Sequence, residues 1–328
     1  MSLKTTSLVS VICCVILASC ASAPPSWMGN YREEYPSSEY IVQRGSGDTV
    51  EFAKTNGLQA IAQYFQTSVD ASMQTQLKTM SNGVDTFEQR STLTDIQVTS
   101  QIDLFGVEFT EPYFSKADNQ WYILTYIHRE TAWRQFKPRI EDDRNAFTAL
   151  YTQARKQKDT FTEFQSYYLA WNKGQDFLES LEFGRLLMDG VDSQYREDRA
   201  LVATLPATLQ EKAQACSMRF SISGDYEEIF TASIKNAFAD MGFVVNENSG
   251  IYRLKVVVTD NPAKHNTLQA VYPVVDISIT DKDGKAVYSL QYKGERFVAT
   301  TLETAKRRGF RRTATEVKTE IINDFKQF

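Results

Sequence analysis

The side chains that perform most nucleophilic and metal-binding chemistry are scarce in this chain of 328 residues, which has four cysteines and two histidines. Zinc sites and histidine-based triads need these residues at defined spacings, and neither His128 nor His265 belongs to an H-E-x-x-H pattern. No G-x-S-x-G or S-x-x-K sequence is present. Carboxylates are abundant but show no spacing that indicates paired acid–base work. We therefore expect a protein that is not an enzyme and uses no metal or other cofactor.

The strongest concentration of charge is the segment "AKRRGFRR", which places five cations within seven residues. They are Lys306, Arg307, Arg308, Arg311 and Arg312. On a helix several of them would lie opposite an apolar stripe, where they could bind lipid phosphates, an anionic cell-wall polymer or an acidic partner. The alternative is a solvated helix face that pairs locally with Glu303 and Glu316. The whole chain has 36 Lys and Arg against 41 Asp and Glu, a weakly acidic balance that argues against nucleic-acid binding.

Two further motifs are better explained by turns than by ligand binding. In "RGSGDT" the third glycine of a dinucleotide fingerprint is replaced by Val50, so Gly45 and Gly47 are predicted to be turn glycines before a helix. In "TDKDGKAVYS" the residues required before and after a calcium loop are absent, so Asp283-Gly284 is predicted to form a hairpin turn.

The N-terminal segment has the features of an export leader. Its only charge is Lys4, and the mostly apolar stretch from Leu8 to Ala18 is shorter than the roughly 20 residues that span a bilayer. Leu17-Ala18-Ser19-Cys20 resembles the bacterial lipobox. That resemblance implies cleavage before Cys20, a diacylglycerol on its thiol and acylation, such as palmitoylation, of the new amine. An ordinary secretory signal or a membrane-anchored helix with an incidental cysteine is the alternative.

The remaining cysteines give the protein no disulfide framework. Cys13 and Cys14 lie within the leader, so the mature chain would keep only Cys20 and Cys216. Cys216 falls on the apolar face of a predicted strand, which indicates a buried structural thiol.

The pattern along the chain predicts an α+β fold with a leader at 1–19, a tether at 20–26 and three further parts. Residues 27–132 form an α/β domain with a strand, a long helix at about 49–77, a polar loop at 80–90 and two strands. Its helix is predicted to use Asp48 as N-cap in a capping box, and Leu58 belongs to its apolar stripe.

Residues 133–213 are predicted to be a helical spacer, with helices at about 139–157, 161–188 and 194–204 and a short one that begins at Pro206. Thr160 is predicted to open a second capping box. An aromatic row in this spacer could line a groove for a partner helix or form an internal core. Its members are Phe161, Phe164, Tyr167, Tyr168, Trp171 and Phe177.

Residues 214–328 are predicted to be a second α/β domain with the order β-α-β-β-β-α and a mostly antiparallel sheet covered by helices on one face. The segment "FVVNEN" could add a strand, and the final helix is expected at about 301–325.

Four segments, in order, resemble a known family: "PPSWMGNY", "YIVQRGSGDTVEFAKTNGLQAIAQYF", "LFGVEFTEPYF" and "WYILTYIHRE". Together they resemble the twenty-kilodalton bacterial membrane lipoproteins over residues 25–132. The matching positions are Trp27, Gly45, Gly47, Ala53, Gly106, Val107, Tyr122 and Leu124. The resemblance implies a cell-envelope lipoprotein, in some branches associated with flagellar assembly, and no catalytic residues. Gly57 within the helix and the long C-terminal extension depart from that family. The C-terminal domain is similar only in topology to the α/β domains of envelope lipoproteins that activate peptidoglycan synthases or export curli.

These features together predict a lipid-anchored envelope protein that acts as a structural, assembly or scaffolding component. Its partners would be the membrane, through acyl chains on Cys20, and one or more envelope proteins. Ala21, where aspartate would favour the inner membrane, favours the outer membrane. The alternative is a periplasmic or surface lipoprotein that recognises a glycan, a lipid or a peptide.

Overall fold

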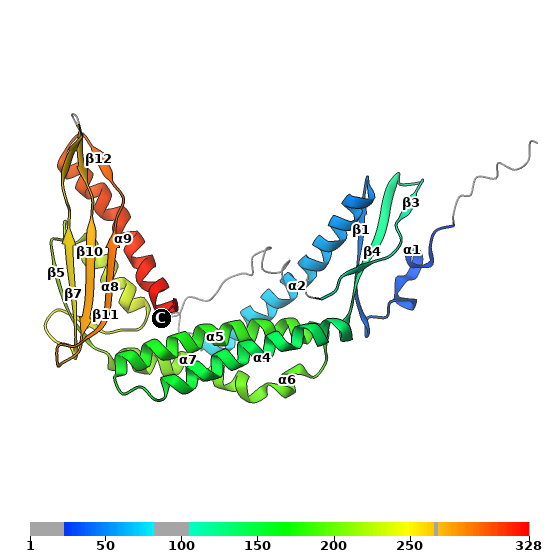
Figure 1. Ribbon diagram of the computed structural model, residues 1–328, viewed down its shortest axis with the longest axis horizontal. Helices are drawn as coiled ribbons and strands as arrows, with labels where there is room; N and C mark the ends of the chain where they lie inside the picture. Colours follow the sequence, from blue (N-terminus) through cyan, green and yellow to red (C-terminus); the bar gives the residue numbers. More distant parts are fainter. Residues whose placement is uncertain (1–22, 82–104, 266–267, 328) are drawn as a thin grey trace, which may run out of the picture. The chain divides into compact units, whose positions relative to one another are not determined.

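The computed structural model describes residues 23–81, 105–265 and 268–327 (Figure 1). The expected α+β class is confirmed. The chain separates into two compact units, the smaller comprising Met1–Ala62 with Gly106–Arg129 and the larger Gln63–Phe105 with Glu130–Phe328. Cys20 and most of the loop expected at 80–90 lie outside the described residues.

The smaller unit is built on an antiparallel sheet with the strand order β1-β4-β2, in which β3 also pairs with β4. The strands are β1 (Tyr40–Gly47), β2 (Glu108–Phe109), β3 (Tyr113–Ser115) and β4 (Gln120–His128). A short helix, α1 (Ser26–Asn30), and the 3₁₀ turn η1 (Tyr31–Glu33) precede it. Three consecutive residues of β4 are buried, so this strand is covered on both faces, as the sequence predicts.

The backbone of helix α2 (Val50–Ser81) packs directly against the backbone of this sheet, because glycines at the contact have no side chain to separate them. A Cβ placed on Gly45 of β1 would lie 2.0 Å from the carbonyl oxygen of Ala53 and 2.6 Å from the amide nitrogen of Gly57. A Cβ on Gly57 would lie 2.0 Å from Oγ1 of Thr125 in β4. The prediction that Gly45 and Gly47 are turn residues is therefore wrong: both belong to β1, and Gly45 serves this close contact.

The buried stripe of α2 differs from the predicted one at its beginning. Leu58 is 37 % exposed, because the buried side steps by four residues from Ala53 through Gly57. The stripe then continues as predicted through Ile61, Phe65 and Val69.

Both predicted capping boxes are displaced by one residue. In α2 the hydroxyl oxygen of Thr49, not the carboxylate of Asp48, accepts a hydrogen bond from a first-turn amide, at 3.2 Å. In α5 (Thr160–Leu187) the cap is Asp159, whose carboxylate accepts from the amide of Thr162 at 2.9 Å. Aspartate and threonine both cap well, so adjacent Asp-Thr pairs leave the first residue of a helix undecided.

The larger unit contains four helices in its central part in addition to the second half of α2. They are α4 (Arg129–Ala154), α5, α6 (Val191–Gln194) and α7 (Arg196–Ala215). Pro206 lies inside α7 and does not begin a separate helix as predicted. Burial of Val202, Leu205 and Leu209 along α7 stabilises the helix on both sides of this proline.

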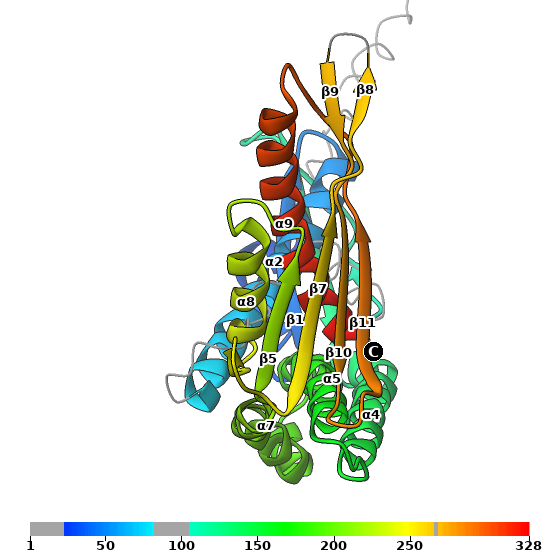
Figure 2. The same ribbon diagram turned by 90° about the vertical axis from the view of Figure 1, so that its left-hand side faces the viewer.

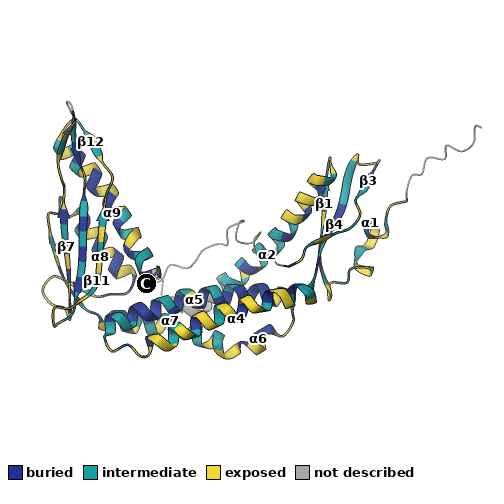
Figure 3. Cartoon of the chain, viewed as in Figure 1, coloured by how far each residue is buried: buried dark blue, intermediate teal, exposed yellow. Residues whose placement is uncertain are grey.

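Helix α5 is the centre of this unit and is buried on nearly every side (Figure 3). Two glycines bring its neighbours close. A Cβ on Gly174 would lie 3.0 Å from a methyl of Val202 in α7, and one on Gly184 would lie 2.6 Å from a methyl of Ile140 in α4. The aromatic row of α5 is buried, which confirms the internal-core alternative over the partner groove.

The C-terminal part of the larger unit is a five-stranded sheet with the order β11-β10-β7-β5-β6. Its strands are β5 (Met218–Ser223), β6 (Val245–Asn246), β7 (Tyr252–Thr259), β10 (Val274–Thr280) and β11 (Ala286–Lys293). Strand β5 runs parallel to β6 and β7, whereas β7, β10 and β11 are antiparallel. Helices α8 (Ile229–Asp240) and α9 (Leu302–Gln327) lie on one face of the sheet (Figure 2). The strand predicted in "FVVNEN" is confirmed as β6, and Asp283-Gly284 lies in the predicted turn between β10 and β11.

A second, three-stranded sheet was not expected from the sequence. It has the order β12-β9-β8 and consists of β8 (Ala263–His265), β9 (Leu268–Val271) and β12 (Phe297–Ala299). Gly309 of α9 packs against it, since a Cβ there would lie 2.9 Å from the ring of Phe297. These strands are too short to show a clear alternation in sequence.

One polar junction joins the start of α5 to the five-stranded sheet. The hydroxyl of Tyr252 in β7 donates to the Asp159 carboxylate at 2.8 Å and accepts from the amide of Phe161 at 3.1 Å. Burial and the bond to Asp159 raise the pKa of Tyr252, so the phenol remains a donor at all physiological pH values. Around this junction, the ring of Phe161 contacts Phe243 and Phe325.

We expect Tyr252→Phe to lower the free energy of unfolding by about 1–3 kcal/mol, because it leaves the Asp159 carboxylate and the Phe161 amide without this partner in a buried site. Urea denaturation followed by circular dichroism measures the loss. Tyr272→Phe is the matched control, since Tyr272 is exposed and should lose almost nothing. Equal stability of the two variants would contradict the importance given to this junction.

Candidate functional site

The five cations predicted to form a site lie in the first half of α9, where the four arginines are exposed and Lys306 is half-buried. The opposite side of the helix is buried and includes Ala305, Phe310, Val317 and Ile321. This arrangement confirms the predicted helix and its two faces. It also brings the cations next to acidic residues of other elements, which the sequence alone did not indicate.

Arg307 is held by carboxylates on two elements. Its guanidinium donates to both carboxylate oxygens of Glu227, at 2.8 and 3.2 Å, and to Glu303 at 3.3 Å. The hydrogen bond from Arg307 lowers the pKa of the Glu227 carboxyl, so this pair stays charged well below neutral pH. Glu303 was expected as a local partner, but Glu227 lies far away in the sequence.

Two further cations of the cluster are paired as well. Lys306 forms an ion pair with Asp260, and Nε of Arg312 lies 2.5 Å from the carboxylate of Glu316. Arg308 and Arg311 are exposed and make no ion pair with a described residue. Exposed pairs of this kind contribute little to stability because water and salt screen them, so the cluster orients side chains more than it stabilises the fold.

The other chemistry-bearing residues named from the sequence belong to other elements. His128 is at the end of β4, where its ring packs edge-on against Tyr40 at 5.1 Å. His265 ends β8 and pairs in register with Leu268. The Asp281 carboxylate accepts hydrogen bonds from two amides of its own turn, both at 2.9 Å, and thus shapes the hairpin. The two histidines therefore lie in different units.

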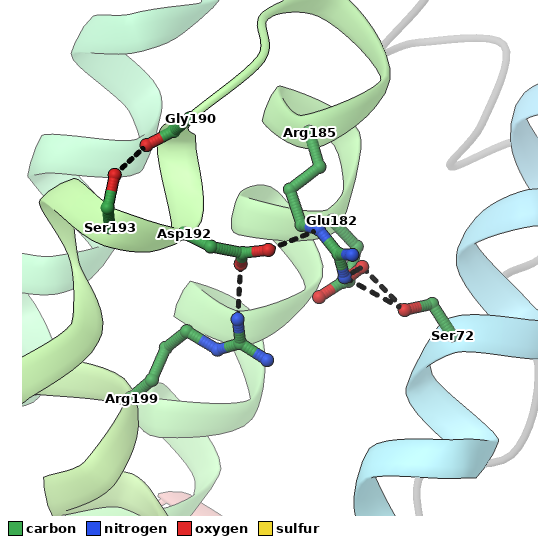
Figure 4. A network of polar contacts seen from close by, with 7 residues as sticks. All are labelled: Ser72, Glu182, Arg185, Gly190, Asp192, Ser193 and Arg199. Carbon is green, nitrogen blue, oxygen red and sulfur yellow. Dashed lines mark hydrogen bonds and ion pairs between the residues drawn. The ribbon is translucent and has the colours of Figure 1, made fainter.

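A polar network that the sequence did not reveal joins α2, α5, α6 and α7 (Figure 4). Its buried member is Glu182, only 3 % exposed, whose carboxylate accepts from Ser72 and from Arg185, both at 2.6 Å. Arg185 also contacts Asp192 at 2.9 Å, and Asp192 forms an ion pair with Arg199. The signal for this network in the sequence is the pair Glu182 and Arg185, which are three residues apart in a predicted helix and can therefore interact on one face.

An open pocket of about 450 Å³ lies beside this network. It is lined by Gly190, Asp192, Ser193, Arg196 and Arg199. The carboxylate of Asp192 is matched by two arginines, whereas Arg196 is exposed and has no ion pair among the described residues. Arg196 could bind a small anion in this pocket. The Asp192 carboxylate beside it is already paired with two arginines and is therefore not available as a base.

In the described ranges, no group of three or more His, Cys, Asp or Glu side chains is placed to hold a metal ion. Nor does any described helix combine the length and the apolar composition that crossing a bilayer requires.

Comparisons with known proteins find distant similarity in structure only. No protein-family model matches the chain, and no curated protein matches it. The secreted protein HP1454 of Helicobacter pylori is 12 % identical, with a TM-score of 0.35 over 85 % of this chain and 96 % of its own. A minor lipoprotein of Acinetobacter baumannii is 13 % identical, with a TM-score of 0.27 over 34 % of this chain and 91 % of its own. Protein XCC0632 of Xanthomonas campestris is 15 % identical, with a TM-score of 0.23 over 32 % and 77 %. Solved bacterial lipoproteins and secreted proteins are thus among the structures similar to this chain.

Cys216 is fully buried, as the sequence predicts, and burial raises the pKa of its thiol to about 12. At pH 8 only about one thiol in ten thousand would be ionised, and the thiolate is the form that reacts. We expect iodoacetamide at pH 8 to leave Cys216 of the folded protein unlabelled and to label it fully in urea. Mass spectrometry of the Cys216 peptide measures this, and rapid labelling without urea would contradict the buried position.

Proposed function

We propose that this protein is a lipid-anchored component of the bacterial cell envelope that has a structural or assembly role and catalyses no reaction. The observation that carries the proposal is Leu17-Ala18-Ser19-Cys20, which follows a mostly apolar stretch that has no charge after Lys4. Two or three acyl chains attached at Cys20 would hold the protein at a membrane far more firmly than one chain would. The small and proline-rich residues 21–26 would act as a short tether.

The assembly role is supported by how the chain uses its charges. The buried carboxylate of Glu182 and the half-buried carboxylate of Asp192 are both compensated by arginines, so neither is held as a free acid or base. Arg308 and Arg311 remain available on α9. In this proposal they contact carboxylates of an envelope protein, and Ala21 directs the anchored chain to the outer membrane.

A ligand-binding lipoprotein is the second candidate, and the pocket beside α6 is the observation that favours it. The exposed Arg196 at its rim could attract an anionic group of a glycan, lipid or peptide. The binding site would then lie in the larger unit rather than on α9.

Replacement of the acylated thiol tests the anchor. We expect Cys20→Ser to move the protein from the detergent phase to the aqueous phase in phase partitioning, because no diacylglycerol can be attached. Cys216→Ser is the matched control, and it should stay in the detergent phase. Unchanged partition of Cys20→Ser, or a mature protein whose mass includes no acyl group, would overturn the anchor.

Crosslinking in intact cells tests the assembly role. We expect a defined envelope protein to be crosslinked in constant proportion and identified by mass spectrometry. Charge reversal by Arg308→Glu and Arg311→Glu should reduce the yield at least fivefold, because it would place like charges against the partner. The same yield from the variant would remove α9 from the contact. Only random neighbours in the crosslinked material would argue for the ligand-binding alternative.

A further inference from the structure

The five-stranded sheet of the larger unit has one face covered by α8 and α9, and Figure 2 shows its strands from the other side. Alternate residues of β5, β7, β10 and β11 point to that second face and are exposed or half-buried. The cations on this face are Arg219, Arg253, Lys255 and Lys293.

Strand register places three of these cations together. Arg219 of β5 lies directly opposite Arg253 of β7, and Lys255 follows two residues later on the same side of β7. Neighbouring strands are about 4.8 Å apart, so the two arginines rise side by side from the sheet. Like charges directly opposite one another destabilise a sheet. The chain therefore maintains a local repulsion on this face.

No described carboxylate compensates these charges. Arg219, Arg253 and Lys255 form no ion pair within the described residues, in contrast to Arg307 and Arg312 on α9. The acid on this face is Asp276, which lies in the next row and accepts a hydrogen bond from Gln291 at 2.7 Å. An uncompensated cationic patch on a chain with a net charge of −5 is a specific feature and not a result of overall composition.

Hydroxyl groups surround the three cations. Ser221 lies opposite Lys255, Lys255 lies opposite Ser278, and Ser278 lies opposite Ser289, which forms one row across four strands. Thr280 lies opposite Arg253 in the row of the arginines. The patch thus combines fixed positive charge with donors and acceptors that can bind the hydroxyl groups of a sugar.

The composition of the face decides between classes of partner. The described residues include several large exposed apolar side chains, and none of these belongs to β5, β7, β10 or β11. Val257 and Val274 are the half-buried apolar members of the face, and the exposed Ile251 directly precedes β7, so apolar contact is limited here. Fixed cations beside rows of hydroxyl groups instead favour a polymer that carries both anionic groups and hydroxyl groups. We propose that this face, centred on Arg219, Arg253 and Lys255, binds an acidic polysaccharide through its carboxylate or phosphate groups. The proposal goes beyond the envelope role above and does not depend on acylation of Cys20.

The test measures binding of polygalacturonate, a carboxylate-bearing sugar polymer, to full-length chains that all carry Cys20→Ser. We expect Arg219→Gln with Arg253→Gln to weaken binding at least tenfold and to reduce its dependence on salt. The matched control is Arg32→Gln with Arg134→Gln, which removes the same charge from two exposed arginines outside the sheet and should change the Kd less than twofold. Removal of the two opposed arginines should leave the urea midpoint unchanged or raise it, which separates lost binding from lost folding.

Three further probes decide the class of ligand. Fully methyl-esterified polygalacturonate should bind at least tenfold more weakly than the acid form. Polyglutamate bound as tightly as polygalacturonate would overturn recognition of a sugar. Vesicles containing phosphatidylglycerol that require Arg219 and Arg253, together with no binding of polygalacturonate, would overturn the proposal in favour of a membrane surface. Equal losses from the two arginine pairs would reduce the effect to general charge attraction and overturn it as well. None of these outcomes depends on whether the acyl anchor exists.

Discussion

Helix α5 is buried on nearly every side, and the other elements of the larger unit pack around it. Its first turn packs against the five-stranded sheet. There Asp159 caps the helix and also accepts a hydrogen bond from the Tyr252 hydroxyl. Its buried residues include Gln165, Gln175 and Glu182 besides the aromatic rings, so the surrounding elements must supply both apolar and polar contacts. The helices around it and the sheet at its N-terminal end therefore depend on one another, which explains why they form one compact unit.

The chain treats its charges in three different ways. Glu182 is buried and fully compensated, so removing one partner would leave an unpaired charge in the core. The cations of α9 are mostly paired at the surface, where each pair contributes little. The cations on the open face of the sheet are neither buried nor paired. Only this third group has an arrangement that intramolecular stability does not explain.

The sequence predicted the fold class, most helices and the strands of the five-stranded sheet, because each of these has enough residues for its periodicity to be recognised. It located both helix N-termini only to within one residue, since Asp48-Thr49 and Asp159-Thr160 offer two capping groups each. The role of Gly45 was missed because a glycine in a strand and a glycine in a turn are alike without knowledge of what packs above it.

The candidate sites also combine features that are visible in the sequence with features that depend on tertiary structure. The cations of α9 were found because they are adjacent in sequence, but Glu227 and Asp260 reach them only through tertiary structure. The alternation of polar and apolar residues in the sequence marks Arg219 and Arg253 as outward-facing residues of their strands. Their position side by side depends on the parallel pairing of β5 with β7, and strand register cannot be obtained from either strand alone.

Helix α9 follows, in the sequence, every element it packs against, and this order has a consequence for biogenesis. Phe325 contacts rings from α5, α8 and β11, so the aromatic core of the larger unit is closed by a late segment of the chain. During synthesis or passage through a translocation pore, the aromatic rings of α5, α8 and β11 therefore remain exposed until α9 has emerged. A chaperone that shields aromatic surface during this interval would favour correct completion of the unit over aggregation.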